Sequence, residues 1–185
     1  DPDPRRRGRR GRRGTHGDRI VIAATALIAE DEALLAASLR AELARLWPEL
    51  RVVATVDHGA AAVEAALAQR PQLLFLDIRM PGMSGLEAAQ ALAEEWPVEA
   101  RRPLPLIVFV TAYDQYALQA FERAAVDYLQ KPVQPARLAA CCARLRDTLA
   151  LRTAANGAAK PAAADDAALL GRLRTLLAAP AEAAP

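Results

Sequence analysis

The sequence places an aspartate directly after an apolar segment that has the composition of a buried strand. In "LLFLDIRMPGMSG", residues 73–85, four apolar residues run into Asp77, and a Met-Pro-Gly turn follows after two further residues. An aspartate in this position can cap a turn. It can also act as a nucleophile, because a carboxylate oxygen forms covalent intermediates in several classes of phosphoryl-transfer protein.

Other predicted strands also end on side chains that can do chemistry: Glu30-Asp31 after residues 25–29, Thr111 after residues 104–110, and Lys131-Pro132 after residues 126–130. Each has a structural alternative when taken alone. Acids favour the N-terminus of a helix, a threonine followed by Asp114 resembles a helix cap, and a lone lysine is usually solvated. The joint interpretation is functional, because ligand chemistry collects at the carboxyl ends of parallel strands.

The chemistry of such a cluster is specific. Three neighbouring carboxylates repel one another and favour a bound divalent cation, and an all-oxygen site with few protein ligands suits Mg²⁺. Asp77 could then attack phosphorus and form an aspartyl phosphate. Lys131 would pair with the phosphoryl oxygens, and Thr111 would donate a hydrogen bond to one of them.

Apolar runs alternate with helical periodicity along the chain. The patterns predict strands at 25–29, 51–56, 72–77, 104–110 and 126–130, and helices at about 35–46, 59–70, 84–96, 114–123 and from 135 onward. Strands that are apolar throughout are typical of a parallel sheet covered on both faces. The predicted fold class is therefore α/β, a doubly wound parallel five-stranded sheet made of five βα units, with right-handed crossovers.

Two helices carry further signals. Ser84 is the predicted N-cap of its helix, with Leu86, Ala89 and Ala93 facing inward. In the last helix, which opens at Pro135, the spacing predicts one apolar face made of Leu138, Cys142, Leu145 and Leu149.

Residues 25–150 resemble the receiver domain of two-component response regulators, which has a flavodoxin-like fold. The family's acid pair falls on Glu30 and Asp31, its phosphoacceptor on Asp77, its conserved hydroxyl on Thr111 and its lysine on Lys131. The family often has aspartate where this chain has Glu30, which keeps the charge on a longer arm.

The resemblance implies more. It implies Mg²⁺ as cofactor, with the backbone carbonyl of Arg79 as a further ligand, a cis peptide bond before Pro132, and Tyr128 as the aromatic switch residue. It also implies a sensor histidine kinase as partner and a homodimer on activation, formed by the fourth helix, fifth strand and fifth helix, with Tyr113, Tyr116 and Phe121 on or near that face.

The segment "TAYDQYALQAFERAAVDYLQKPV", residues 111–133, resembles receivers that precede a LytTR-type DNA-binding domain. The expected organisation is a disordered Arg/Gly-rich tail at 1–19, a receiver domain at 20–152, and an Ala-rich linker with a short amphipathic helix at 153–185. The output domain is expected to be absent from this chain. DNA binding in the setting of transcription regulation would then depend on that missing domain.

Two other functions compete with this interpretation. Haloacid-dehalogenase-like phosphatases also use an aspartate nucleophile, but they resemble an Asp-x-Asp pattern, and here Arg79 occupies the second position and cannot act as general acid or base. The arginine-rich tail could instead bind nucleic acid non-specifically. We expect a signalling module rather than an enzyme with turnover.

Composition sets the remaining limits. Residues 1–19 hold eight of the 24 basic and three of the 22 acidic residues, so the rest of the chain carries a small net negative charge. No apolar run approaches the ~18 residues of a membrane span, so no membrane partner is expected. The adjacent Cys141 and Cys142 are poorly placed to bridge each other, and a reduced, cytoplasmic compartment fits them.

Overall fold

The computed structural model describes residues 21–97, 103–112 and 127–157. The predictions for the arginine-rich tail, for the helix at 114–123 with its aromatic residues, and for the amphipathic helix near the C-terminus lie outside these residues. The predicted domain boundaries therefore stay predictions.

The described residues form a five-stranded sheet in the order β2-β1-β3-β4-β5, with every neighbouring pair parallel. The strands are β1 (Ala24–Ala29), β2 (Leu50–Val56), β3 (Leu73–Asp77), β4 (Leu106–Thr111) and β5 (Asp127–Gln130). The predicted strands are confirmed. The non-consecutive neighbours β1 and β3 require a crossover, which is the mark of a doubly wound sheet.

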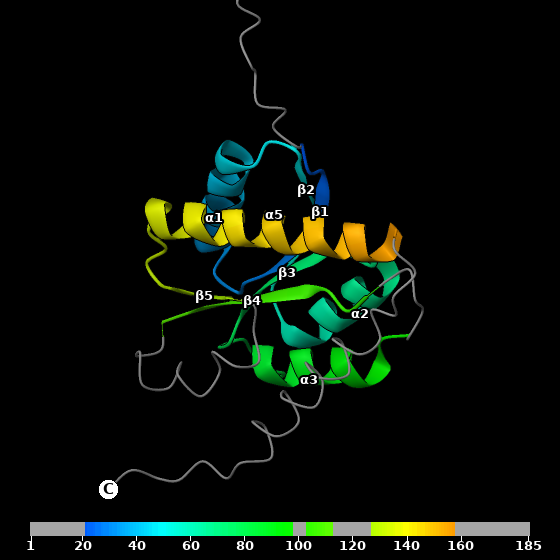
Figure 1. Ribbon diagram of the computed structural model, residues 1–185. Coiled ribbons are helices and arrows are strands. Elements are labelled where there is room, and N and C mark those ends of the chain that lie inside the picture. Colours follow the sequence, from blue (N-terminus) through cyan, green and yellow to red (C-terminus); the bar gives the residue numbers. More distant parts are fainter. Residues whose placement is uncertain (1–20, 98–102, 113–126, 158–185) are drawn as a thin grey trace, which may run out of the picture.

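Helices cover both faces of this sheet, as predicted (Figure 1). The helices are α1 (Ala33–Leu46), α2 (Gly59–Gln69), α3 (Gly85–Glu95) and α5 (Pro135–Gly157). One buried apolar cluster joins α1 and α5 to the sheet, and a second joins α2 and α3 to the opposite face. None of the helices in the described ranges combines the length and apolarity needed to cross a membrane.

The central strands explain the apolar runs of the sequence. All residues of β3 and β4 are buried. Both faces of these strands are covered, so alternation of polar and apolar residues is lost. Asp77 is the charged residue of β3, and it is as buried as its apolar neighbours.

Helix α3 begins at the predicted cap. The side chain of Ser84 accepts a hydrogen bond from the backbone N–H of Glu87 at 3.2 Å, and the Ser84 N–H donates to the Glu87 carboxylate at 2.8 Å. This reciprocal pair satisfies two N–H groups that a helix start leaves unbonded. Ala89 and Ala93 are buried as predicted, whereas Leu86 is only half-buried at the edge of its cluster.

Helix α5 buries the predicted apolar face against β4 and β5. The helix continues to Gly157, so residues 153–157, which composition assigns to a linker, are helical. Alanine favours helix, and Arg152 ties this last part to the body of the protein by donating to the Leu104 carbonyl at 2.8 Å. Cys141 and Cys142 are buried free thiols, and burial raises the pKa of both.

Candidate functional site

The strand order brings the ends of β1 and β3 side by side. The register pairs Ala29 with Leu76, so Glu30 follows β1 at the level where Asp77 ends β3. On the other side of β3, Asp77 pairs with Val110, one residue before Thr111. Glu30, Asp77 and Thr111, which lie far apart in the sequence, are thereby placed at one edge of the sheet, which is where ligands bind in folds of this class.

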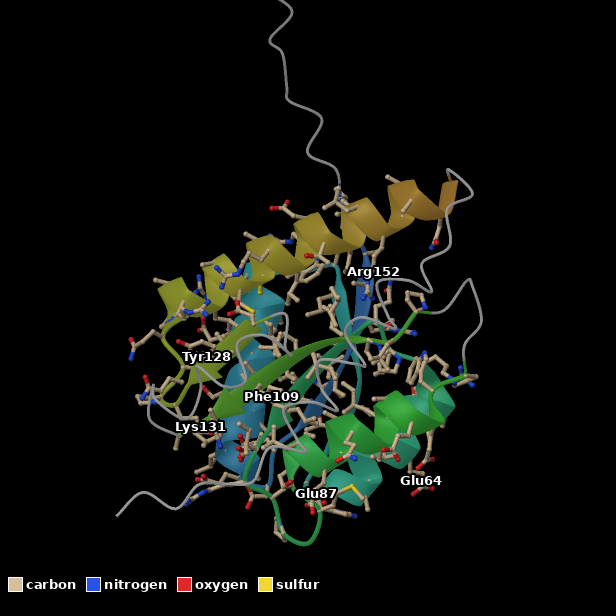
Figure 2. All side chains as sticks on the ribbon, turned by 60° about the horizontal axis from the view of Figure 1, so that its bottom comes forward. Glu64, Glu87, Phe109, Tyr128, Lys131 and Arg152 are labelled. Carbon is tan, nitrogen blue, oxygen red and sulfur yellow. The ribbon has the colours of Figure 1, made fainter. Side chains whose placement is uncertain are left out.

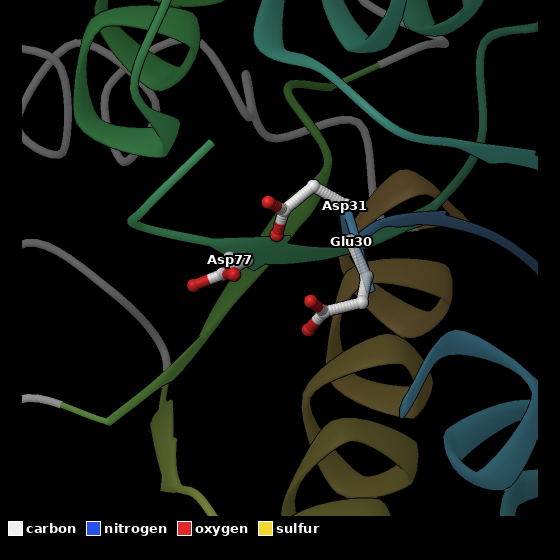
Figure 3. A group of neighbouring side chains, drawn as sticks. All are labelled: Glu30, Asp31 and Asp77. Carbon is white, nitrogen blue, oxygen red and sulfur yellow. The ribbon is translucent and has the colours of Figure 1, made fainter. Parts of the chain in front are cut away.

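Three carboxylates converge there. One carboxylate oxygen each from Glu30, Asp31 and Asp77 lies within 4.8 Å of the others (Figure 3). Glu30 and Asp77 are buried, and Asp31 is exposed. The donors are all oxygen, two of the carboxylates are buried, and the exposed side at Asp31 would leave a cation open to water ligands. This donor set fits Mg²⁺, which binds few protein carboxylates and keeps several waters.

Lys131 closes the cluster from the end of β5. Its ammonium nitrogen lies 2.7 Å from a Glu30 oxygen and 2.9 Å from an Asp77 oxygen. The backbone N–H of Lys131 donates to the Thr111 carbonyl at 2.7 Å, which fixes the lysine relative to β4. Burial acts to lower the pKa of Lys131, but the hydrogen bonds to the two carboxylates outweigh it, so the pKa is raised.

Glu30 is held on both carboxylate oxygens. One oxygen pairs with Lys131, and the other accepts a hydrogen bond from the backbone N–H of Glu32 at 3.1 Å. Burial raises the pKa of Glu30, and the nearby charge of Asp77 acts in the same direction, against the two hydrogen bonds. The longer side chain thus reaches the cluster while its direction is fixed.

The loop after β3 folds back over Asp77. The Arg79 N–H donates to an Asp77 carboxylate oxygen at 3.1 Å, and the Gly85 N–H donates to the Ile78 carbonyl at 3.0 Å. A Cβ atom on Gly85 would lie 2.0 Å from the Asp77 carbonyl oxygen, so this close approach requires glycine. Gly82 makes the turn with a positive φ of 74°.

The remaining predicted residues lie at the same edge. Thr111 is fully buried at the end of β4, and the Lys131–Pro132 peptide bond is cis, as the resemblance implies. Tyr128 and Lys131 lie near each other, and Arg152 lies apart from both (Figure 2). Tyr128 is half-buried on β5 beside Arg137, outside the carboxylate cluster. The assignment of the Arg79 carbonyl as a metal ligand stays a prediction.

Sequence reasoning missed one charged group. Asp127 opens β5, is buried, and pairs with both Arg137 and Arg144 of α5. Burial acts to raise the pKa of Asp127, but the two arginines outweigh it and hold the pKa below its usual value. An acid within the apolar run 126–129 was the available signal, since a buried acid requires a partner.

Comparisons with known proteins agree with this geometry. The family model described as "Response regulator receiver domain" matches residues 26–143. An uncharacterized response regulatory protein of Vibrio cholerae is 47% identical over 125 residues, which are 68% of this chain and 46% of that protein. The transcriptional regulatory protein BtsR of Escherichia coli K12 is 42% identical over 120 residues, 65% of this chain and 47% of BtsR. The chain thus spans about half the length of these curated relatives.

Solved structures show the same fold. The REC domain of AraT, a response regulator from Geobacillus stearothermophilus, is 31% identical with a TM-score of 0.60, covering 71% of this chain and 99% of that domain. The response regulatory domain of MrkE from Klebsiella pneumoniae is 28% identical with a TM-score of 0.56, covering 70% of this chain and 98% of that domain.

Proposed function

The chain belongs to the response regulator receiver domain family, and on that premise we propose that it takes a phosphoryl group from a histidine kinase onto Asp77 and thereby switches an output surface. The observation that carries the proposal is the single cluster at the carboxyl edge of the sheet. It combines a buried carboxylate as nucleophile, two further acids and a buried lysine, Lys131, within direct reach.

Asp77 is the group in this cluster best placed to be the acceptor. It sits at the centre of the edge, between Glu30 and Asp31 on one side and the strand that ends on Thr111 on the other. One of its carboxylate oxygens accepts a hydrogen bond from the Arg79 N–H of the loop that follows β3. Positioning of this kind is the main contribution that a protein makes to phosphoryl transfer.

Glu30, Asp31 and Asp77 would hold Mg²⁺, with the Arg79 carbonyl as a further ligand. When bound, the cation offsets the negative charge of the carboxylates and of an incoming phosphoryl group. Asp31 faces solvent, so it marks the side from which cation and donor approach. The exposed Leu34, in the first turn of α1 and three residues after Asp31, would offer an apolar contact to a partner protein.

The transfer step is an in-line displacement. A carboxylate oxygen of Asp77 forms a bond to phosphorus, the bond from phosphorus to the donor histidine nitrogen breaks, and the released imidazole takes up a proton. Lys131, now paired with Glu30 and Asp77, would move its ammonium to the new phosphoryl oxygens. Such charge-assisted contacts to phosphate are short and strong. Each molecule accepts one group and has no turnover substrate, so the role is signalling rather than enzymatic.

The switch would follow from the new charge. A phosphoryl group adds nearly two negative charges, and Thr111 would donate its hydroxyl to one of the oxygens. Tyr128 would then change rotamer and bias the face that includes β5 and α5 toward a homodimer. A difference of a few kcal/mol between two conformations is enough for a large change in partner affinity.

The output would be transcription regulation in the cytoplasm. BtsR is a transcriptional regulator by name, and the matched part is 47% of its length. We propose that in the whole protein a LytTR-type DNA-binding domain follows the receiver, with residues 153–185 as connection and DNA contacted by that domain alone. Residues 1–19 would form a separate tail.

Incorporation of a phosphoryl group from acetyl phosphate tests the proposal. Intact mass should rise by about 80 Da, the mass of one phosphoryl group, in the presence of Mg²⁺ and not with EDTA. Asp77→Asn should abolish the adduct, and Asp57→Asn should leave it unchanged, because Asp57 is an exposed acid that is not one of the three clustered carboxylates. An adduct that persists in Asp77→Asn would place the acceptor elsewhere and overturn the proposal.

A further inference from the structure

Two arginines of α5 share one buried acid at the start of β5. Arg137 donates to both carboxylate oxygens of Asp127, at 2.5 and 3.1 Å, and Arg144 also donates to this carboxylate. The Asp127 side chain is only 6% exposed, so its charge requires compensation inside the protein. Two arginines give this acid more donors than a single ion pair would provide.

The two arginines differ in what else they contact. Arg137 donates a third hydrogen bond, at 2.9 Å, to the backbone carbonyl of Tyr128. Its guanidinium carbon also lies over the Tyr128 ring, 5.7 Å from the ring centroid. Arg144 lies seven residues further along α5 and donates to the same Asp127 oxygen, Oδ2, that also accepts from Arg137. Both arginines therefore neutralise Asp127, and Arg137 in addition contacts Tyr128.

The ring contact has a preferred geometry. A guanidinium over the face of a tyrosine is attracted by the electron density of the ring. Here the guanidinium cannot follow the ring freely, because its fork is held by Asp127 and by the Tyr128 carbonyl. The attraction is available only while the ring stays under Arg137.

We propose that Arg137 is a positioning residue that holds Tyr128 in the conformation of the unphosphorylated protein, with Asp127 as its anchor. This inference rests on the proposed function, in which Tyr128 changes rotamer when Asp77 is occupied. Arg137 thereby raises the free energy needed for Tyr128 to change rotamer when Asp77 is occupied. It acts through Tyr128 and contacts none of the reacting atoms.

The test follows Tyr128 directly in the full 185-residue chain. Incorporation of 3-fluorotyrosine gives one ¹⁹F resonance for each of the three tyrosines, and Tyr128→Phe identifies the resonance of interest. Beryllofluoride with Mg²⁺, a mimic of the phosphoryl group, is titrated into the wild type, Arg137→Gln, Arg137→Lys and the matched control Arg144→Gln. The readout is the beryllofluoride concentration at which half of the Tyr128 resonance has converted.

Arg137→Gln should need a roughly two- to fivefold lower concentration, which is the effect of losing one exposed cation–π contact. Arg137→Lys keeps the charge without the planar fork and should lie between Arg137→Gln and the wild type. Arg144→Gln should match the wild type, because within the described part of the chain its side chain pairs with Asp127 and not with Tyr128. This difference between the two arginines is what a merely structural ion pair would not produce.

Several results would overturn the inference. Equal shifts for Arg137→Gln and Arg144→Gln would mean that only the ion pair matters, and an unchanged or higher midpoint in both Arg137 variants would mean that Arg137 does not hold the ring. A Tyr128 resonance that ignores beryllofluoride in a wild type that still accepts phosphate would also refute it. Failure of the proposed function is distinct, since the wild type would then gain no phosphoryl group at Asp77.

Discussion

Replacing Lys131 with methionine removes one buried positive charge and keeps a side chain of similar length. The lysine is only 13% exposed, and it pairs with Glu30 at 2.7 Å and with Asp77 at 2.9 Å. Removing one partner of a buried ion pair costs about 3–5 kcal/mol, because the other charge stays buried without compensation. Since the exposed Asp31 marks a side open to water, we expect the lower end, about 3 kcal/mol.

Urea unfolding in the presence of EDTA measures this loss. With a slope of about 2 kcal/mol per molar urea, 3 kcal/mol lowers the midpoint by about 1.5 M. Repeating the measurement with saturating Mg²⁺ should recover much of the loss, because the cation supplies the missing positive charge to the same carboxylates. A ligand at a hundred times its dissociation constant stabilises the folded state by about 2.7 kcal/mol.

The control is Arg45→Met. Arg45 pairs with Glu42 at 2.8 Å on the exposed surface of α1, so its loss should leave the midpoint almost unchanged, with or without Mg²⁺. If Lys131→Met behaves like Arg45→Met, Lys131 does not neutralise the cluster. If Mg²⁺ stabilises Lys131→Met no more than it stabilises the wild type, the cation and the lysine do not share the same carboxylates.

Other perturbations test the surroundings of the site. Gly85→Ala forces a Cβ atom against the Asp77 carbonyl, so urea unfolding should show a loss of about 1–3 kcal/mol; an unchanged midpoint would contradict the close approach. The two arginines lower the pKa of Asp127 below its ordinary value of 3.8, so its ion pairs stabilise the folded protein above pH 3.8. This stabilisation is lost as the pH falls through the pKa that Asp127 has in the folded protein. Asp127→Asn should therefore be less stable than the wild type near pH 7 and should lose less stability on acidification; parallel pH curves would refute this. Burial raises the pKa of the Cys141 and Cys142 thiols, so Ellman's reagent should react slowly with the native protein and quickly in urea, and fast labelling without urea would show that they are accessible.

The sequence was sufficient for the architecture because the sheet is central and its helices are amphipathic. Apolar runs such as 73–76 mark strands covered on both faces, and Ser84 with Glu87 marks a helix start. The end of α5 was harder to predict. "TAANG" has the composition of a linker, yet alanine continues a helix readily. The Leu104 carbonyl that accepts a hydrogen bond from Arg152 lies just before β4, far away in the sequence.

The candidate site was predictable in its residues but not in its pairings. Four of the five predicted strands end on a side chain that can do chemistry, and parallel pairing collects Glu30, Asp77 and Lys131 at one edge. The sequence suggested that Lys131 would meet phosphoryl oxygens, whereas the structure pairs it with two carboxylates. The ion pairs of Asp127 were missed for a related reason, because the packing of α5 on the sheet decides which of its arginines reach this acid.

The most direct measurement locates the phosphoryl group on the chain. After reaction with acetyl phosphate and Mg²⁺, reduction with borohydride converts an aspartyl phosphate to homoserine, and tandem mass spectrometry of the resulting peptides identifies the position. The account predicts homoserine at Asp77, with its formation dependent on Mg²⁺ and no equivalent change at Glu30 or Asp31. Homoserine at another aspartate, or equal formation at Asp77 in EDTA, would contradict it.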